Sequence, residues 1–520
     1  MQKGLAAQHP ARTFKRLTSI PFCPPTARVA DILQTKVNSR PNPDTEWIHQ
    51  QAARHLPNKP YGRINSPEGK DAHDITKHWA RIIDRSNPQG APGGDGLRFS
   101  YFHTTPTSRN HIALWLQAMS QHQKNDFVQW WMTAGTLCGQ CKTDDEGNYP
   151  SKPEQITSAR PIIKFTIWRR LMAQSLAPPV CKALRGICEP HGQYGLSPSG
   201  CPAIYRSAQL HHDLHPTWIH GPLDIKNAHS AIKRRTIIEC LTAIAEADRS
   251  ENHSLHYKHL LWTLSHYGVG KQRVYINTDE DPANPFRTIY MTESLPQGDG
   301  LATASFDSTY TLRVIKPLND IFTESPLDIA VCHDDTTLFA PAWLPPKGES
   351  DLARLEALPQ DDLKELTRKY DNAKISPLHV AHYLKDPDTY PLTNPDVLAL
   401  LNIAIPHFAI LAGAFAEIAQ LNAGLELAEG KKMKFYQRML PEKDPSDINH
   451  PENPYKSLLF PGVGIHKGAY KVAGGEVGDP STIEAKIRAT MEPWRQILKQ
   501  MTTMPECPIF AAFLAIKLAF

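Results

Sequence analysis

The stretch Ile329-Ala-Val-Cys-His-Asp-Asp-Thr-Thr-Leu-Phe339 decides the fold of this chain. Two short apolar runs flank a tight acidic turn, and this pattern predicts a β-hairpin with Asp334 and Asp335 at its tip. A second stretch, from His220 to Ala228, predicts a short strand that enters a turn at Asp224. If the two strands are adjacent in one sheet, three carboxylates converge at its edge.

Converging carboxylates on rigid strands suit phosphoryl transfer from a nucleoside triphosphate. Two divalent cations about 4 Å apart can activate the attacking hydroxyl and stabilise the leaving pyrophosphate, and Mg²⁺ prefers oxygen ligands. Asp224, Asp334 and Asp335 are therefore candidate catalytic residues and metal ligands. An Asp-Asp pair alone is weak support, because Asp361-Asp362 has the same form within a charged stretch that we expect to be solvated.

The hairpin stands among segments whose apolar spacing predicts alternating helices and strands. Arg160 to Leu176 begins as an apolar strand and becomes a helix, and Arg234 to Ala247 predicts a helix with one apolar face. Helices are also expected at His111 to Met132 and at about Ile403 to Leu421. Between Pro345 and Pro395, a charged and Pro-punctuated sequence predicts an insertion at the surface.

The composition is that of a globular chain with a large core. Of its 520 residues 41% are hydrophobic and 21% charged, and the net charge of +4 permits a polyanionic partner without requiring one. No run approaches the roughly 20 apolar residues of a membrane span, and Met1 to Pro24 lacks the apolar centre of a signal peptide. We expect a soluble intracellular protein, in the nucleus or the cytoplasm, that is neither secreted nor bound to a membrane.

The 9 cysteines are an odd number and are mostly scattered, which predicts free thiols in a reducing compartment. Cys138-Gly-Gln-Cys141 and Cys188-Glu-Pro-His191 have the pairwise spacing of zinc ligands. The sequence leaves a zinc site open as the alternative to free thiols.

Several further short motifs occur in order along the chain. They are Ala91–Arg98, Arg160–Ile162, Gln193–Gly195, Leu295–Leu301 with Phe306, Gly424–Lys432 and Lys471–Gly478. Together with the stretches around Asp224 and Asp334, they resemble the reverse transcriptases of non-LTR retrotransposons over about Pro92 to Ala485. In that family they correspond to a Gly-rich opening segment, two fingers motifs, four palm motifs and the primer-grip region. The order is more specific than any one motif.

The resemblance implies an α/β (α+β) fold with the fingers and palm of a right-hand polymerase, the antiparallel palm sheet being flanked by helices. Residues 1–88 would be a partly helical N-terminal extension and residues 89–215 the fingers. The palm would span 216–478, with the charged insertion at about 345–395. Residues 479–520 would begin a thumb or form truncated C-terminal helices, so we expect the thumb to be truncated or absent.

The resemblance also implies a function. The chain would be an RNA-directed DNA polymerase that extends a primer 3′-hydroxyl on an RNA template by two-metal phosphoryl transfer. Its partners would be an RNA template, a DNA primer and dNTPs. Its cofactor would be Mg²⁺, two ions, with Mn²⁺ as an alternative.

The family's metal site maps onto the acidic residues already described. Asp224 and Asp334 would hold both metals, and Asp335 would bind or shape the site. Lys431 would protonate or neutralise the leaving pyrophosphate, and its alternative is a surface lysine.

Four further residues would bind the nucleotide. Arg160 and Lys142 would reach the triphosphate, because cationic side chains suit phosphate; for Lys142 an exposed strand-end charge is the alternative. Gln297 and Gly298 would lie under the templating and incoming bases, and for Gly298 an ordinary turn is the alternative.

The match departs from the family near the site. His229 replaces an aromatic residue that excludes the ribose 2′-hydroxyl, so the preference between dNTPs and NTPs stays open. Cys332 replaces a Tyr, Gly300 a Pro, and Ala428-Glu429 an Asn-Pro. Two alternatives therefore remain: an RNA-directed RNA polymerase, and a degenerate, non-catalytic remnant that binds nucleic acid.

Overall fold

The computed structural model describes most of the region that carries these motifs. The described residues are 21–37, 44–56, 70–88, 90, 92–103, 105–120, 132–142, 149–150, 152–250, 253–268, 272–278, 286–291, 293, 295–346, 365, 368, 373–428, 434–438, 465–466, 469–472 and 475–502. The fold they form mixes helices with two main sheets, as expected for an α/β chain.

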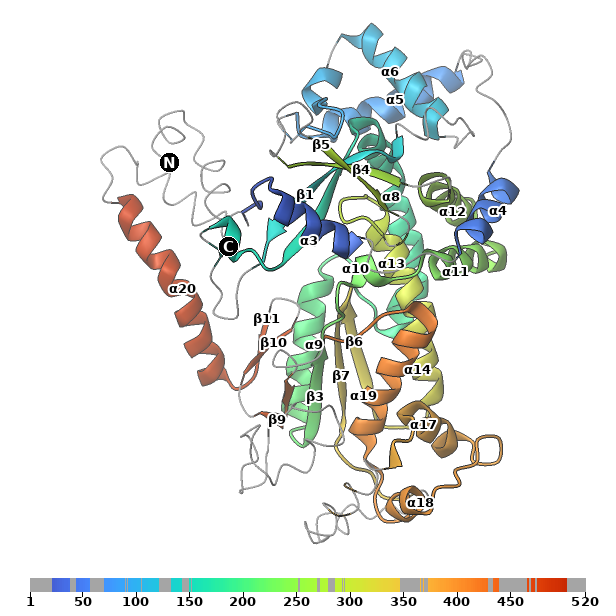
Figure 1. Cartoon of the computed structure of the whole chain (residues 1–520), viewed down its shortest axis with the longest axis vertical. Coiled ribbons are helices and arrows are strands. Elements are labelled where there is room, and N and C mark those ends of the chain that lie inside the picture. The colour runs from blue at the N-terminus through green and yellow to red at the C-terminus, as the bar shows by residue number, and fades with distance from the viewer. Residues whose placement is uncertain are drawn as a thin grey trace.

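A five-stranded sheet carries the acidic hairpin (Figure 1). Its strands, in spatial order, are β6 (Asp328–Cys332), β7 (Asp335–Pro341), β3 (Trp218–Leu223), β8 (Phe435–Tyr436) and β9 (Ile465–His466). The first four are antiparallel to their neighbours, and β8 pairs with β9 in parallel. The hairpin predicted for 329–339 is thus confirmed, and so is the strand that leads to Asp224.

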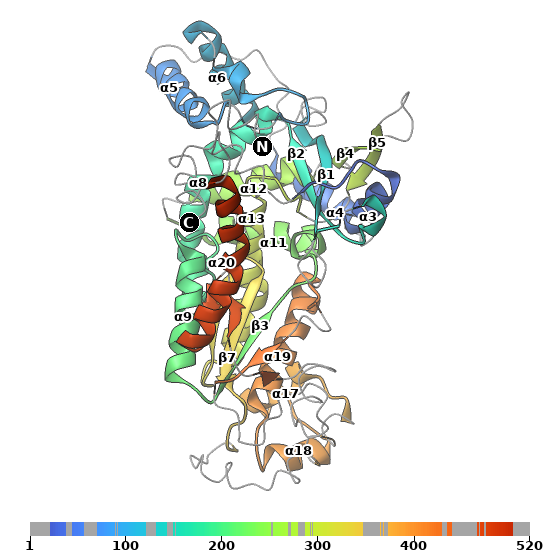
Figure 2. The same ribbon diagram turned by 90° about the vertical axis from the view of Figure 1, so that its left-hand side faces the viewer.

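Both faces of this sheet are covered, which explains why apolar residues such as Val331, Leu338 and Phe339 occupy successive positions of its strands. Ala330 and Phe339 pack on one face against α9 (Gly200–Leu214), whereas Val331 and Leu338 belong to the main core on the other. α19 (His407–Ile418) lies along that second face, against β7 (Figure 2). The acidic tip therefore lies at the end of two strands, β6 and β7, that are buried on both faces of the sheet.

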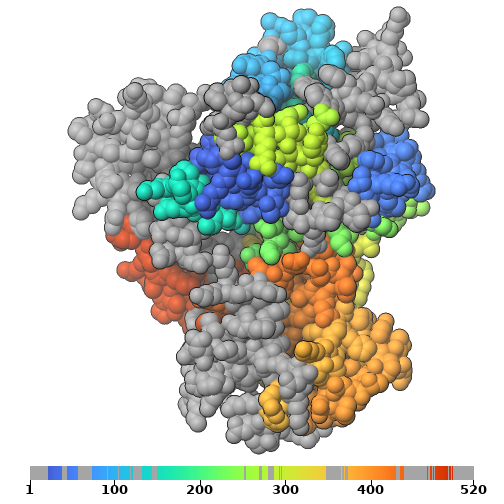
Figure 3. Space-filling view, viewed as in Figure 1, coloured from blue at the N-terminus to red at the C-terminus, as the bar shows by residue number. Residues whose placement is uncertain are grey.

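A second, four-stranded sheet has the order β2–β1–β4–β5 and its own core cluster. Its strands are β1 (Gly135–Cys141), β2 (Ala159–Phe165), β4 (Gln272–Asn277) and β5 (Phe286–Met291). The helix α3 (Ala27–Val37) packs against β2 and β5 and contributes Val29, Ala30 and Leu33 to that cluster. Figure 3 shows α3 and β5 side by side at the surface. Residues 27–37, which belong to the predicted N-terminal extension, thus pack against this sheet as a helix.

Helices surround and join the two sheets (Figure 1). The strand-to-helix change predicted near Arg160 is confirmed by β2 and α8 (Ile167–Cys188), and the helix predicted at 234–247 by α11 (Arg234–Ala247). The others near the sheets are α4 (Thr45–His55), α5 (Lys70–Arg85), α6 (Pro106–Ser120), α10 (Ala228–Ala231), α12 (His253–Tyr267), α13 (Ala302–Tyr310), α14 (Lys316–Ile321) and α20 (Pro480–Thr502). The short strands β10 (Tyr470–Val472) and β11 (Gly475–Val477) form a separate hairpin beside α9.

The segment predicted as a charged surface insertion is only partly described. Its residues 377–385 form α17 (Pro377–Lys385), whose Val380 and Ala381 are buried against α19 in the main core. α18 (Pro395–Leu401) follows and buries Val397. For α17 the expectation of a solvated excursion was wrong, because Leu378, Tyr383 and Leu384 pack against the main core beside the buried Val380 and Ala381. In the described segments, no helix combines the length and the apolar character needed to span a bilayer.

Candidate active site

The three predicted acidic residues meet at one end of the five-stranded sheet. β3 and β7 pair antiparallel, with Leu223 opposite Thr336, so the next positions along the two chains are Asp224 and Asp335. Side chains at directly opposed positions have Cβ atoms about 5 Å apart. Asp334 precedes Asp335 in the two-residue turn between β6 and β7.

The three carboxylates are close enough for the charges of Asp334 and Asp224 to affect the pKa of Asp335. Solvent reaches Asp224 and Asp335, and Asp334 is half-buried. The pKa of Asp335 is raised, first because neighbouring atoms remove part of its hydration and then because Asp334 and Asp224 carry like charges. A divalent cation would relieve that repulsion, and carboxylates are the donors that Mg²⁺ prefers. The donor set fits Mg²⁺ in type, although no three ligating side chains in the described ranges already form a metal-binding group.

Gln193 holds the hairpin turn from the side. Its Nε2 donates to the His333 carbonyl at 3.0 Å, and its Oε1 accepts from the backbone N–H groups of His333 at 3.1 Å and Gly195 at 2.8 Å. Gln193 is fully buried. The turn needs this support, because His333 has a φ of 59°, a conformation that costs energy for a residue other than Gly. The Gln193–Gly195 motif therefore fixes the backbone that carries Asp334.

Asp307 holds the same turn from inside. Its Oδ2 accepts from Nδ1 of His333 at 2.9 Å, and Asp307 has no exposed surface. This hydrogen bond raises the pKa of His333, while burial raises the pKa of Asp307. Gly195 leaves the space for the pair, since a Cβ there would lie 2.5 Å from the His333 ring. Neither Asp307 nor His333 was predicted as a site residue, and the sequence holds no local signal for their contact.

His229 lies next to the carboxylates, in the short helix that follows Asp224. Its carbonyl accepts from the N–H of Leu295 at 2.8 Å, and its ring centroid lies 4.9 Å from that of Phe306. Burial lowers the pKa of His229, and the negative charge of Asp334 opposes this shift. Its buried Nδ1 has no hydrogen-bond partner in the described part of the chain. That atom can serve a ligand hydroxyl.

Gln297 and Gly298 belong to a loop whose backbone packs against Ile163 of β2. The Gln297 carbonyl accepts from the N–H of Ile163 at 2.7 Å, and its buried side-chain Oε1 has no partner among the described groups. Gly298 has a φ of 115°, and a Cβ there would lie 2.2 Å from the Ile163 carbonyl oxygen. Only glycine fits this approach.

A buried ion pair anchors the loop that carries Gln297. Asp299 accepts hydrogen bonds from Arg169 of α8 and from the hydroxyl of Tyr267 in α12. Burial would raise the pKa of Asp299, but Arg169, His266 and the hydrogen bonds from Tyr267 and the Leu301 N–H together lower it. Removing one member of such a pair strands the other charge in the core. The loop is therefore fixed relative to both helices.

Arg160 and Lys142 lie near each other in the four-stranded sheet. Arg160 is opposite Gln140, and Lys142 directly follows Cys141 at the end of β1; both cations are exposed. Lys36 of α3 joins them: its Nζ donates to Ser158 Oγ at 2.8 Å and to the Ala159 carbonyl at 2.7 Å. Burial, and then the charges of Lys142 and Arg160, lower the pKa of Lys36 to about 8. Lys36 was not predicted as part of this group.

Other predicted positions lie elsewhere. Lys431 falls outside the described residues. Cys188 lies in the main core, whereas Cys141 lies in β1 with its Sγ 3.3 Å from that of Cys23. The two halves of the zinc-like pattern thus lie in different elements, β1 and the end of α8.

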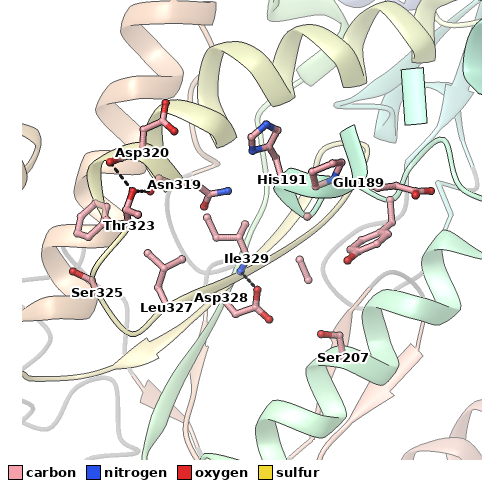
Figure 4. Close-up of a pocket in the computed structure, with 15 residues that line it drawn as sticks. Glu189, His191, Ser207, Asn319, Asp320, Thr323, Ser325, Leu327, Asp328 and Ile329 are labelled. Carbon is pink, nitrogen blue, oxygen red and sulfur yellow. Dashed lines mark hydrogen bonds between the residues drawn. The ribbon is translucent and has the colours of Figure 1, made fainter. Parts of the chain in front are cut away.

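Two pockets lie beside the elements that carry the acidic hairpin, one near Asp224 and the other near the start of β6. One, of about 520 Å³, is lined by Lys226, Gln420 and residues 425–428, and Ala428 donates its N–H to the Asp224 carbonyl at 2.8 Å. The other, of about 450 Å³, contains none of the predicted site residues. Figure 4 shows polar side chains around it from three elements: Asn319 and Asp320 from α14, Asp328 from β6 and Ser207 from α9.

Comparison with models of known protein families gives no match for this chain, and neither does comparison with curated proteins.

Proposed function

We propose that this chain is an RNA-directed DNA polymerase of a retroelement, which adds deoxynucleotides to a primer 3′-hydroxyl on an RNA template. The observation that carries the proposal is the β3–β7 pairing, which ends with Leu223 opposite Thr336 and so leaves Asp224 and Asp335 as the next positions, with Asp334 in the adjoining turn. Three carboxylates from distant parts of the sequence meet on a rigid support. Two-metal nucleotidyl transfer needs this arrangement.

In the proposed mechanism Asp224 and Asp334 hold two Mg²⁺ ions, and Asp335 adds a third carboxylate. Bound Mg²⁺ supplies activation of the attacking hydroxyl and neutralises the departing pyrophosphate. The chain's own part is to keep the carboxylates in place. Gln193 and Asp307 do this through their hydrogen bonds to His333, which keep the turn from shifting.

Other residues would bind the nucleotide. Arg160 and Lys142 supply positive charge for the triphosphate, and the Gln297–Gly298 loop supplies a flat backbone surface for the base. The loop contacts β2 at Ile163, on the strand that carries Arg160, and it contacts His229 through Leu295. One set of hydrogen bonds thus connects the residues proposed to bind the base, the sugar and the phosphates. Lys431 remains a proposed contact to the pyrophosphate.

A second candidate is an RNA-directed RNA polymerase. The observation in its favour is the buried Nδ1 of His229, which has no partner in the described structure and can bond a ribose 2′-hydroxyl. A phenyl ring at that position would instead exclude the hydroxyl.

Primer extension on an RNA template, with dNTPs or NTPs and Mg²⁺, tests both candidates. The Asp334→Asn, Asp335→Asn double variant is the control. Extension with dNTPs that the control abolishes supports the first proposal, and extension with NTPs alone supports the second. Folded protein that extends with neither nucleotide, yet binds template as well as the control does, would make it a non-catalytic nucleic-acid-binding remnant.

A further inference from the structure

Two thiols lie in contact directly beside the acidic turn. The Sγ atoms of Cys201 and Cys332 are 3.2 Å apart, and both cysteines are free. A disulfide has an S–S length of about 2.05 Å, so closing this pair requires a movement of roughly 1.2 Å. Rotation about the side-chain bonds of an exposed residue can supply such a movement.

The backbone on either side of these thiols is held in place. Cys332 is the last residue of β6, and the preceding Val331 exchanges hydrogen bonds with Tyr194 at 2.8 Å and Gly192 at 2.9 Å. Cys201 is the second residue of α9, and a Cβ on Gly200 would lie 2.0 Å from the Tyr194 carbonyl oxygen. Tyr194 thus contacts both segments, which keeps the two sulfur atoms together.

The two thiols differ in their access to solvent. Cys201 is exposed, whereas Cys332 is 4% exposed. Thiol–disulfide exchange begins with attack by an accessible thiolate. Cys201 is therefore the thiol that reacts first with a dissolved disulfide, and Cys332 is the thiol that then displaces the reagent from Cys201.

We propose that Cys201 and Cys332 form a thiol–disulfide site whose co-reactant is a low-molecular-weight disulfide such as oxidised glutathione. The Cys201 thiolate attacks one sulfur of the reagent, and one small thiolate leaves. The Cys332 sulfur then attacks the Cys201 sulfur, gives its proton to solvent and releases the second small thiolate. The protein loses two electrons and two protons, and the reagent is reduced to two thiols.

The consequence for catalysis rests on the proposed polymerase function. Cys332 pairs directly with Asp335 and is two residues from Asp334. A covalent bond to α9 restrains the end of β6 that carries the turn, so the carboxylates, which form no metal-binding group yet in the described ranges, can no longer close around a metal ion. The oxidised protein therefore loses primer extension, and a reductant restores it.

A second thiol pair gives an internal comparison. Cys23 and Cys141 have Sγ atoms 3.3 Å apart, but Cys23 is half-buried and Cys141 is buried. Burial raises the pKa of Cys23 to about 12. With limiting oxidant, Cys201 and Cys332 should therefore become linked before Cys23 and Cys141.

The test incubates the full chain with oxidised glutathione, blocks the remaining thiols and maps linked peptides by mass spectrometry without reduction. The parent and the control Cys138→Ser should give the Cys201–Cys332 linkage, and Cys201→Ser should not. Cys201 is exposed and serine is nearly isosteric, so this variant should fold, which thermal unfolding checks. Stable glutathione adducts at Cys201 without linkage, or no reaction at Cys201, would overturn the site.

Primer extension before and after oxidation then tests the consequence. Loss of extension in the oxidised parent but not in oxidised Cys201→Ser is the expected result. A linked protein that extends as well as the reduced one would overturn the inhibitory role and leave the linkage established. If no form extends a primer, the polymerase proposal fails, and the peptide map still decides the thiol site.

Discussion

Gln193 and His333 are joined by a pair of hydrogen bonds, of 3.0 and 3.1 Å, that occupy both the carbonyl and the N–H of His333. Residues 140 positions apart in sequence are thereby locked together at the turn that carries Asp334. Gln209 offers a matched comparison, because it makes the same two bonds with Gly478, at 3.1 and 3.0 Å.

The first prediction follows from this pairing. Gln193→Ala leaves buried backbone groups without partners and should lower the free energy of unfolding by about 1–3 kcal/mol. Extension by the remaining folded protein should be lost, whereas Gln209→Ala, which releases Gly478 of the primer-grip-like motif rather than the catalytic turn, should only reduce it. Urea denaturation and primer extension on both variants provide the measurement. Equal extension by the two variants would show that the turn does not depend on Gln193.

His229→Phe should change which sugar is accepted. The phenyl ring removes the hydrogen-bonding Nδ1 and fills the space of a 2′-hydroxyl, so the ratio of dNTP to NTP incorporation should rise roughly tenfold, the equivalent of one hydrogen bond of about 1.4 kcal/mol. His229→Ala, which opens the space instead, should lower the ratio. Single-nucleotide incorporation with each substrate measures it. An unchanged ratio in both variants would remove His229 from the nucleotide site.

Gly298→Ala should disrupt the loop on β2. The positive φ and the 2.2 Å approach to the Ile163 carbonyl give the new methyl group no room, so we expect about 1–3 kcal/mol of destabilisation. Gly186→Ala in α8 is the matched control, because no atom lies within 4 Å of its Cβ position. It should stabilise the helix by about 0.5–1 kcal/mol. Thermal unfolding that orders the two variants the other way would contradict the loop geometry.

The buried His259 should contribute to acid sensitivity. Its Nε2 lies 2.8 Å from Ser305 Oγ, and burial lowers its pKa from 6.5 to about 3. At pH values between about 3 and 6.5, His259 binds a proton in the unfolded chain but not in the folded protein. Stability should therefore fall as the pH decreases below 6.5, by up to about 1.4 kcal/mol per pH unit for this group.

His259→Gln lacks the titrating group and should lose less stability between pH 7 and pH 5 than the parent does. Urea denaturation at the two pH values measures the difference. An equal decrease in the parent and the variant would mean that His259 does not titrate on unfolding.

Local parts of the fold could be predicted from the sequence. The hairpin at 329–339 and α11 follow from short patterns of apolar residues, and the structure has both. The sequence could not show that Asp224 and Asp335 come to lie at neighbouring positions, because the register of two strands more than 100 residues apart depends on packing. The contact of Asp307 with His333 and the position of Lys36 depend on tertiary structure alone, and no residue pattern indicated them.

The central claim is that the acidic turn catalyses nucleotidyl transfer, and matched substitutions on one hairpin test it most directly. Asp334→Asn changes the turn, whereas Asp328→Asn makes the same change at the start of β6, away from the tip. The measurement is extension of a DNA primer on an RNA template with dNTPs and Mg²⁺, on folded protein. We predict extension by the parent and by Asp328→Asn, and none by Asp334→Asn. Equal extension by Asp334→Asn and the parent would contradict the account.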